Sequence, residues 1–258
     1  MKGPAGVTAL VLAETVAGGL AVLYLSPLWN EVKRGFFTLT ASVLLVLAAS
    51  TWGAAAAGRV AGSDAGLWSA RLSGALTLVL LADVIMMFAR RRSAARVAGF
   101  VSVPLSAALL VAMAGTAEGS FTVATLQLLA GAAFLGAVMD GLLLGHWYLT
   151  DRGLTRGPID RTTNLLLAGV VLEALALLLG GFGPTRASAD FNPLLTSAGL
   201  ASWIALGMVG TTALIGVMIR LTLKGARASA VQAATGFFYL AVITALTAEF
   251  AAKVRFLP

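Results

Sequence analysis

Five of the eleven acidic residues in this sequence stand within long apolar runs. A charged side chain in hydrocarbon costs at least ~2.5–3.5 kcal/mol, so such residues usually face a bundle interior or a wet cavity and mark a function. These acids are Glu14, Asp83, Asp140, Glu173 and Glu249. Carboxyl groups partly buried in a low dielectric can exchange protons near neutral pH. The pattern therefore predicts a proton-handling protein.

The positions of these acids within their runs suggest a path across the membrane. A helix rises 1.5 Å per residue, which puts Asp140 and Glu173 each ~15 Å from the cytoplasmic ends expected for their runs. A short turn joins the two runs, so we expect both carboxyl groups to meet near the midplane, with Glu14 at a similar depth. The predicted proton path comprises Glu14, Asp83, Asp140 and Glu173. The structural alternative is that each acid pairs with an arginine or, protonated, hydrogen-bonds a neighbouring helix.

The only histidine, His146, precedes Trp147 and Tyr148 at the end of an apolar run. Six helical residues separate it from Asp140, which puts the two side chains roughly 120° apart. We therefore expect His146 to meet Asn164, at the start of the next run, rather than Asp140. A histidine that hydrogen-bonds a carbonyl or hydroxyl beside stacking aromatic rings would suit a flat ligand. The alternative is that these rings only anchor the helix end at the membrane interface.

The composition defines the class of protein. Hydrophobic residues make up 59% of the chain and charged residues only 11%, against roughly 25% charged residues in soluble domains. The chain has no cysteine and one histidine, so it offers no ligands for an iron–sulfur cluster, for cysteine-bound zinc or for a haem held by two histidines. We predict no metal, haem or iron–sulfur cofactor in this chain. The net charge of +7 is typical of basic cytoplasmic loops and does not indicate nucleic acid.

Eight apolar runs approach the length of about 20 residues that a membrane-spanning helix needs. We expect one all-α domain over residues 1–258, a polytopic membrane helix bundle. The first run is too long for a signal-peptide core and contains an acid, so we interpret it as a retained helix. The expected spans are Ala5–Leu25, Gly35–Ala57, Leu72–Ala89, Val97–Gly115, Phe121–Leu149, Thr162–Gly181, Thr196–Ile219 and Ser229–Ala252.

The basic residues of the loops predict the orientation. Twelve follow the odd-numbered spans, namely Lys33, Arg34, Arg90, Arg91, Arg92, Arg96, Arg152, Arg156, Arg161, Arg220, Lys224 and Arg227. Six lie on the other side, namely Lys2, Arg59, Arg71, Arg186, Lys253 and Arg255. The positive-inside rule puts the twelve in the cytoplasm and both termini outside. A bacterial inner membrane is the expected location.

Two features of the apolar runs bear on packing. A parallel duplication of four helices is conceivable, although the residues of the two halves do not align well. Small-residue pairs often allow close helix packing in lipid. We interpret the pairs Gly131 with Gly136 and Gly207 with Gly210 in this way.

The stretch from Ala13 to Gly19, AETVAGG, resembles the Glu-x-x-x-Gly-type start of NrfD/PsrC-like membrane subunits of respiratory oxidoreductases. Those subunits are cofactor-free helix bundles that bind a quinone and rely on partner subunits for the redox centres. The resemblance implies an integral membrane subunit of a bacterial respiratory redox complex, not an enzyme by itself, with Glu14 in a proton path or quinol pocket. The quinone-binding residues would then be His146, Trp147, Tyr148 and Asn164.

Two other functions use the same residues differently. In a proton-coupled transporter of a small solute, the acids would couple proton binding to substrate binding. Transporters often have helices broken at mid-depth in corresponding halves, whereas the glycines and prolines here lie mainly near helix ends. In a structural or assembly subunit, the acids would contribute to stability alone.

Overall fold

The protein is a bundle of long helices. The computed structural model describes residues 1–151, 153–182, 190–196, 199–225 and 229–256, and this part of the chain contains ten helices and no strand. Two helices are single turns, α2 (Leu28–Glu31) and α8 (Pro193–Thr196). The other eight are long and apolar enough to cross a membrane, which confirms the predicted multi-pass membrane protein. They are α1 (Gly3–Leu25), α3 (Arg34–Ala57), α4 (Asp64–Phe88), α5 (Arg92–Ala114), α6 (Phe121–Thr150), α7 (Gly157–Gly180), α9 (Leu200–Leu223) and α10 (Ser229–Val254).

Several helices begin earlier than the apolar runs predicted. The helix α4 begins at Asp64, eight residues before the predicted start. Its N-cap is Ser63, whose hydroxyl oxygen accepts a hydrogen bond from the backbone nitrogen of Gly66 at 3.1 Å. Such a cap satisfies a backbone donor that the helix itself cannot pair. Hydropathy marks the part of a helix that suits lipid, whereas the caps mark where the helix starts.

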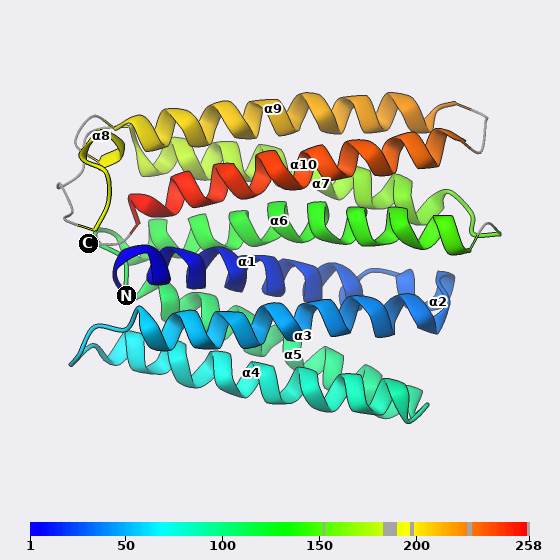
Figure 1. The fold of residues 1–258 in the computed structure, drawn as a ribbon, viewed down its shortest axis with the longest axis horizontal. Coiled ribbons are helices and arrows are strands. Elements are labelled where there is room, and N and C mark those ends of the chain that lie inside the picture. The colour runs from blue at the N-terminus through cyan, green and yellow to red at the C-terminus, as the bar shows by residue number, and fades with distance from the viewer. Residues whose placement is uncertain (152, 183–189, 197–198, 226–228, 257–258) are drawn as a thin grey trace.

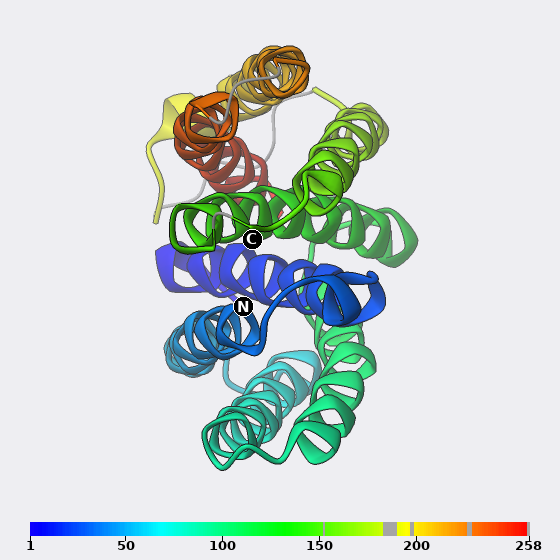
Figure 2. The same ribbon diagram turned by 90° about the vertical axis from the view of Figure 1, so that its right-hand side faces the viewer.

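The eight spans form two groups of four. One group contains α1, α3, α4 and α5, and the other contains α6, α7, α9 and α10. In each group successive helices pack against each other and the fourth returns to the first. The end-on view in Figure 2 shows the same cyclic order in both groups, so that a half-turn brings one approximately onto the other. The parallel duplication is therefore present in the architecture, although the residues do not align.

The two groups meet through their first helices. The most apolar 18-residue windows of α1 and α6 are 78% and 72% buried, against 33–44% in the other spans. Figures 1 and 2 show these two helices side by side at the centre of the molecule. A Cβ atom on Gly18 would lie 1.7 Å from the carbonyl oxygen of Ala132, and one on Gly136 would lie 2.2 Å from the carbonyl carbon of Gly18. Glycine is required here because the two backbones touch.

The glycine pairs differ in their role. The close contacts of Gly131 and Gly136 with α1 confirm the packing prediction for that pair. Gly207 and Gly210 make no such contact within the described chain, because a Cβ atom on either would meet nothing within 4 Å. Both stand on the outward face of α9 and are exposed.

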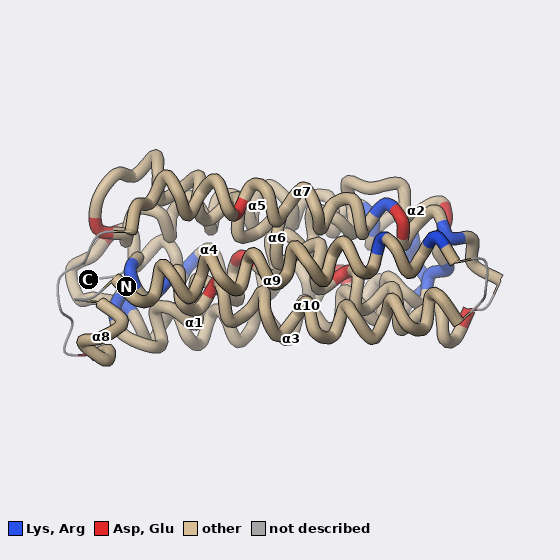
Figure 3. Tube along the Cα trace, turned by 90° about the horizontal axis from the view of Figure 1, so that it is seen from above, with Lys and Arg blue, Asp and Glu red and all other residues tan. Residues whose placement is uncertain are grey.

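The two termini lie at the same end of the bundle, with the α3–α4 and α5–α6 connections (Figure 1). We call this the outer end and the opposite one the cytoplasmic end, following the positive-inside rule. Lysine and arginine gather mainly at the cytoplasmic end in Figure 3. Of the basic residues counted above, Arg152, Arg186 and Arg227 lie outside the described residues.

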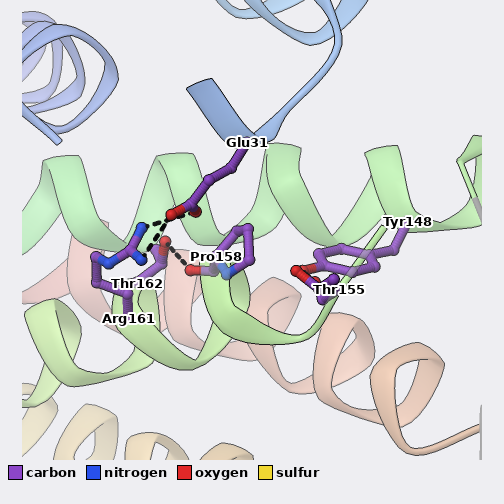
Figure 4. Close-up of polar contacts among 6 residues, drawn as sticks. All are labelled: Glu31, Tyr148, Thr155, Pro158, Arg161 and Thr162. Atoms are coloured by element: carbon purple, nitrogen blue, oxygen red, sulfur yellow. Dashed lines mark hydrogen bonds and ion pairs between the residues drawn. The ribbon is translucent and has the colours of Figure 1, made fainter. Parts of the chain in front are cut away.

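Two ion pairs connect segments at the cytoplasmic end. The Nζ atom of Lys33 lies 3.0 Å from a carboxylate oxygen of Asp151, after α6. The guanidinium of Arg161, in the first turns of α7, pairs with Glu31 of α2, and both of its contacts are 3.0 Å long (Figure 4). Exposed pairs of this kind contribute little stability, roughly 0–1 kcal/mol each. They fix the positions of the loops rather than hold the bundle together.

Candidate functional site

A buried lysine with two carboxylates forms the centre of the site. The Nζ atom of Lys253 lies 2.8 Å from Oε1 of Glu14 and 2.8 Å from Oε2 of Glu249. The side chains of both acids have no exposed surface, and that of Lys253 is 2% exposed. Glu249 and Lys253 are four residues apart in α10 and so lie on the same face of that helix. Glu14 comes from α1, where it packs against Gly131 of α6.

Glu173 of α7 is the fourth member of this cluster. Its side chain is 1% exposed and interacts electrostatically with Glu249, Lys253 and Glu14. Its carboxyl group also lies within hydrogen-bonding reach of Glu249. We call Glu14, Glu173, Glu249 and Lys253 the carboxylate–lysine cluster. Three spans from both four-helix groups contribute to it, so it lies at the boundary between the groups.

The charges of the cluster do not balance. If all four groups were ionised, three carboxylates and one ammonium would leave two net negative charges in a site closed to solvent. Among the described residues, Oε2 of Glu14, Oε2 of Glu173 and Oε1 of Glu249 have no hydrogen-bond partner. Unpaired buried charges are costly, so we expect the cluster to hold protons. Such a group of carboxyls can take up and release protons when its surroundings change.

The sequence placed Lys253 in an outer loop, and this prediction is wrong. Lys253 lies in the last turn of α10 and is buried. The predicted span ended at Ala252, two residues before the end of α10 at Val254, because a terminal lysine is usually taken as a flanking charge. The spacing of Glu249 and Lys253, one helical turn apart in an apolar run, is the signal that could have revealed the pair.

Asp140 does not join the cluster. The sequence predicted that it would meet Glu173, but Glu173 interacts with Glu249 and Lys253 instead. The depth was misjudged because α7 begins at Gly157 rather than Thr162. Glu173 is therefore 16 residues, or ~24 Å, from the cytoplasmic end of its helix, whereas Asp140 is ten residues, or ~15 Å, from Thr150. Asp140 is fully buried, and neither of its carboxyl oxygens has a hydrogen-bond partner among the described residues.

Asp83, the remaining predicted path residue, lies in α4, in the same four-helix group as Glu14 but outside the carboxylate–lysine cluster. The hydroxyl group of Tyr24 donates a hydrogen bond to its Oδ2 atom, which joins α1 to α4. Tyr24 also packs closely on Gly99 of α5, where a Cβ atom would lie 2.1 Å from its ring. Asp83 thus accepts a hydrogen bond from a packed tyrosine of a neighbouring helix, whereas the structural alternative expected an arginine partner or a protonated acid.

The four residues predicted to bind a flat ligand do not converge. The Nε2 atom of His146 hydrogen-bonds the hydroxyl group of Tyr239 in α10. Trp147 packs on Phe36 of α3, with ring centroids 6.2 Å apart. The hydroxyl group of Tyr148 donates a hydrogen bond to the carbonyl oxygen of Thr155 at 2.5 Å (Figure 4). The side-chain oxygen of Asn164 accepts a hydrogen bond from Arg220. The predicted contact of His146 with Asn164 is replaced by the contact with Tyr239, which sequence reasoning missed.

An apolar groove runs along the outside of the central helix pair. It has a volume of about 550 Å³ and lies between α1, α5, α6 and α7. We call it the lateral groove. Leu129, Leu165 and Leu172 line it and are between 38% and 48% exposed, so the groove opens toward lipid. Its walls also include Ala17, Gly18, Ala107, Ala132 and Gly169.

The lateral groove extends from the cytoplasmic end of the bundle to the neighbourhood of the carboxylate–lysine cluster. At its cytoplasmic end it is lined by Ser26 and by Arg161, whose pairing with Glu31 is shown in Figure 4. Toward the outer end, its lining residues Ala17 and Gly169 stand within four residues of Glu14 and Glu173 on the same helices. An apolar molecule in this groove would therefore approach two acids of the cluster.

Comparison with known proteins assigns no family. A scan against models of known protein families, a search of curated proteins and a search of solved structures each gave no match. The resemblance at Glu14 therefore stays a prediction based on one helix. Within the described residues, no three His, Asp or Glu side chains are grouped as a metal site would need.

Proposed function

We propose that this chain is an integral membrane subunit of a bacterial respiratory redox complex, which binds a quinone or quinol and conducts protons through the carboxylate–lysine cluster. One observation carries the proposal. Three carboxyl groups and one lysine are buried together at the boundary of the two four-helix groups, beside an apolar groove that opens toward lipid.

The lateral groove suits a lipid-soluble ring with an apolar tail. Its volume of about 550 Å³ falls within the range of roughly 300–1,000 Å³ for small-molecule sites. The surroundings of His146 suit such a ligand less well, because that residue, Tyr148 and Asn164 already have protein partners. The groove is therefore our preferred quinone site, in place of His146, Trp147, Tyr148 and Asn164.

The cluster would supply the protons of the quinone reaction. Reduction of a quinone to a quinol takes two electrons and two protons, and oxidation of the quinol returns both. Glu14 and Glu173 stand closest to the groove among the acids of the cluster, so they are the candidates to exchange protons with the quinone oxygens. Lys253 would stabilise the carboxylate that remains after a proton has left. The electrons would pass to and from redox centres on partner subunits.

A proton-coupled transporter of a small solute is the second candidate. The observation that favours it is the ion pair between Glu14 and Lys253, which crosses the boundary between two groups of helices with the same arrangement. Binding of a solute or proton at that boundary could break the pair and move the groups relative to each other. Such a transporter would bind its solute without redox partners.

Purification in a mild detergent distinguishes the candidates. The tagged protein would be isolated from its native membrane, and its optical spectrum and co-purifying chains would be determined by absorption and mass spectrometry. The redox proposal predicts defined partner chains with haem or iron–sulfur absorbance, and oxidation of an added quinol. A colourless protein without partners would contradict it and direct the work to transport assays in proteoliposomes.

A further inference from the structure

A second, more polar cavity lies at the outer end of the bundle. It has a volume of about 330 Å³ and is bounded by α6, α7, α9, α10 and the α5–α6 connection. We call it the outer cavity. Its polar lining comes mainly from Glu118, Ser120, Gln127, Ser202 and Arg255. A polar cavity of this size has room for several hydrogen-bonded water molecules.

The inner end of the outer cavity adjoins the carboxylate–lysine cluster from three sides. On α7, the lining residue Leu177 is one helical turn from Glu173. On α10, Ala252 is the neighbour of Lys253. On α6, Gln127 is one turn before Gly131, and a Cβ atom on that glycine would lie 2.5 Å from Oε1 of Glu14. Three of the four helices of the cavity wall, α6, α7 and α10, thus lead within about one turn to a cluster residue or to its direct neighbour.

Gln127 lines the outer cavity on the side of α6 that leads to Glu14. Its side-chain nitrogen donates to the carbonyl oxygen of Ala176 at 3.2 Å, which holds the amide across the space between α6 and α7. The same amide packs against Gly180, where a Cβ atom would lie 2.1 Å from it. The rest of this amide is available to water, since Gln127 is only half-buried.

The lateral groove cannot serve the same purpose. Its walls are almost entirely apolar, so it offers water few hydrogen-bond partners. Among the described residues, the titratable groups beside the outer cavity are Glu118 and Arg255 on its wall, with Glu14, Glu173, Glu249 and Lys253 beyond its inner end. An apolar ligand and a proton would thus reach the cluster by different routes.

We propose that the outer cavity is the aqueous route by which the carboxylate–lysine cluster exchanges protons with the outer side of the membrane, with Gln127 as a positioning residue at its inner end. This inference rests on the proposed function, in that the cluster takes up and releases protons. It adds the side of the membrane on which the exchange takes place and the residues through which it passes. In quinol oxidation, two electrons would pass to the redox centres of partner subunits, and the protons of the two quinol hydroxyl groups would pass to the cluster and from it to water in this cavity.

Labelling of single cysteines tests the route directly. The chain contains no cysteine, so each introduced thiol is the only one. Ala124→Cys and Gln127→Cys place a thiol on the cavity wall. Leu126→Cys, on the lipid-exposed face of the same helix, and Ala132→Cys, in the lateral groove, are the matched controls. A charged thiol reagent that does not cross membranes is added to intact cells from outside.

The reagent reacts with the thiolate and therefore needs water at the site. We expect both cavity cysteines to react about 10-fold faster or more than the two controls, because thiolate forms only where water reaches. Absence of labelling in variants that keep the wild-type thermal unfolding temperature would overturn the proposal. Labelling only from the cytoplasmic side would overturn it as well.

A second arm separates this inference from the proposed function. Turnover of the purified complex with a quinol is measured before and after Gln127→Cys is labelled. The proposal predicts that a bulky label slows turnover at least several-fold, whereas labelled Leu126→Cys keeps its rate. If turnover requires Glu14 but survives the label on Gln127→Cys, the route is wrong and the proposed function stands. If the complex shows no quinol activity at all, cysteine accessibility still decides whether the cavity is an outer water route.

Discussion

The Nζ atom of Lys253 lies 2.8 Å from Oε1 of Glu14, and this ion pair joins the last helix of the second four-helix group to the first helix of the first group. Residues 239 positions apart in the chain thus meet inside the bundle. Lys253 also holds Glu249 at 2.8 Å, so a single ammonium group serves two carboxylates. Lys253 therefore has two roles, as a link between the groups and as the positive charge of the cluster.

Replacement of Lys253 should destabilise the protein strongly. In Lys253→Met, the buried acids lose the only cation that pairs with them among the described residues, and removal of one partner of a buried ion pair typically costs about 3–5 kcal/mol. Thermal unfolding in detergent measures the effect. Lys224→Met, at an exposed position of the cytoplasmic end, is the control and should unfold as the wild type does. Equal unfolding temperatures for the two variants would show that Lys253 is not held as an ion pair.

The contact between α1 and α6 should not tolerate a larger residue at Gly18. A methyl group there would overlap the carbonyl oxygen of Ala132, and overpacking of this kind usually costs about 1–3 kcal/mol. Gly18→Ala should therefore lower the unfolding temperature. Gly207→Ala is the matched control, because its Cβ atom would meet nothing within 4 Å. A stable Gly18→Ala variant would mean that the two backbones are farther apart than described.

Substitution in the lateral groove should weaken quinone binding without loss of stability. Ala107 lines the groove from α5, whereas its neighbour Ala108 is exposed and does not. We expect Ala107→Phe to raise the KM for a quinol about 10-fold, which corresponds to about 1.4 kcal/mol of binding free energy. Ala108→Phe should keep the wild-type KM. The same KM for both variants would remove the groove as the quinone site.

Asp140 lies outside the carboxylate–lysine cluster, and its place in the proton path is still the prediction made from the sequence. On that prediction, Asp140 should matter for turnover rather than for assembly. Asparagine has nearly the same shape as aspartate, and the described structure shows no hydrogen bond to the carboxyl oxygens that the change would break. We therefore expect Asp140→Asn to assemble and unfold as the wild type does while it loses quinol turnover. Wild-type turnover in this variant would remove Asp140 from the proton path, and lost assembly would show a structural role.

The sequence was sufficient for the helices but not for the contacts between them. Span number and alternation follow from length, hydropathy and loop charge, which are local properties of the chain. The partners of the polar residues depend on how the spans pack. An error of a few residues in the predicted end of a helix therefore predicts the wrong partners. Glu173 illustrates this. Because α7 begins at Gly157 rather than Thr162, the depths of Glu173 and Asp140 differ by about a third of the membrane thickness instead of being equal. Likewise, His146 hydrogen-bonds Tyr239, 93 residues away in the chain, rather than the predicted Asn164.

The residues that sequence reasoning missed share one property. Glu249 was noted as an intramembrane acid without a role, and Lys253 was counted as a loop charge. Their meaning depends on each other and on Glu14, from the opposite end of the chain. Where a basic residue ends an apolar run, the sequence should therefore be searched for an acidic residue one helical turn earlier, because the two could form a buried ion pair.

Proton release by the purified complex in proteoliposomes, driven by an added quinol, tests the central claim most directly. Proton release is measured for the wild type and for the variants Glu14→Gln and Glu173→Gln. The control is Asp64→Asn, because Asp64 is an exposed acid at the outer end. We predict that each glutamine variant loses proton release about 100-fold, the lower end of what a positioned proton-transfer group contributes, while Asp64→Asn keeps it. Wild-type proton release in both glutamine variants, with the complex intact, would contradict the role of the cluster.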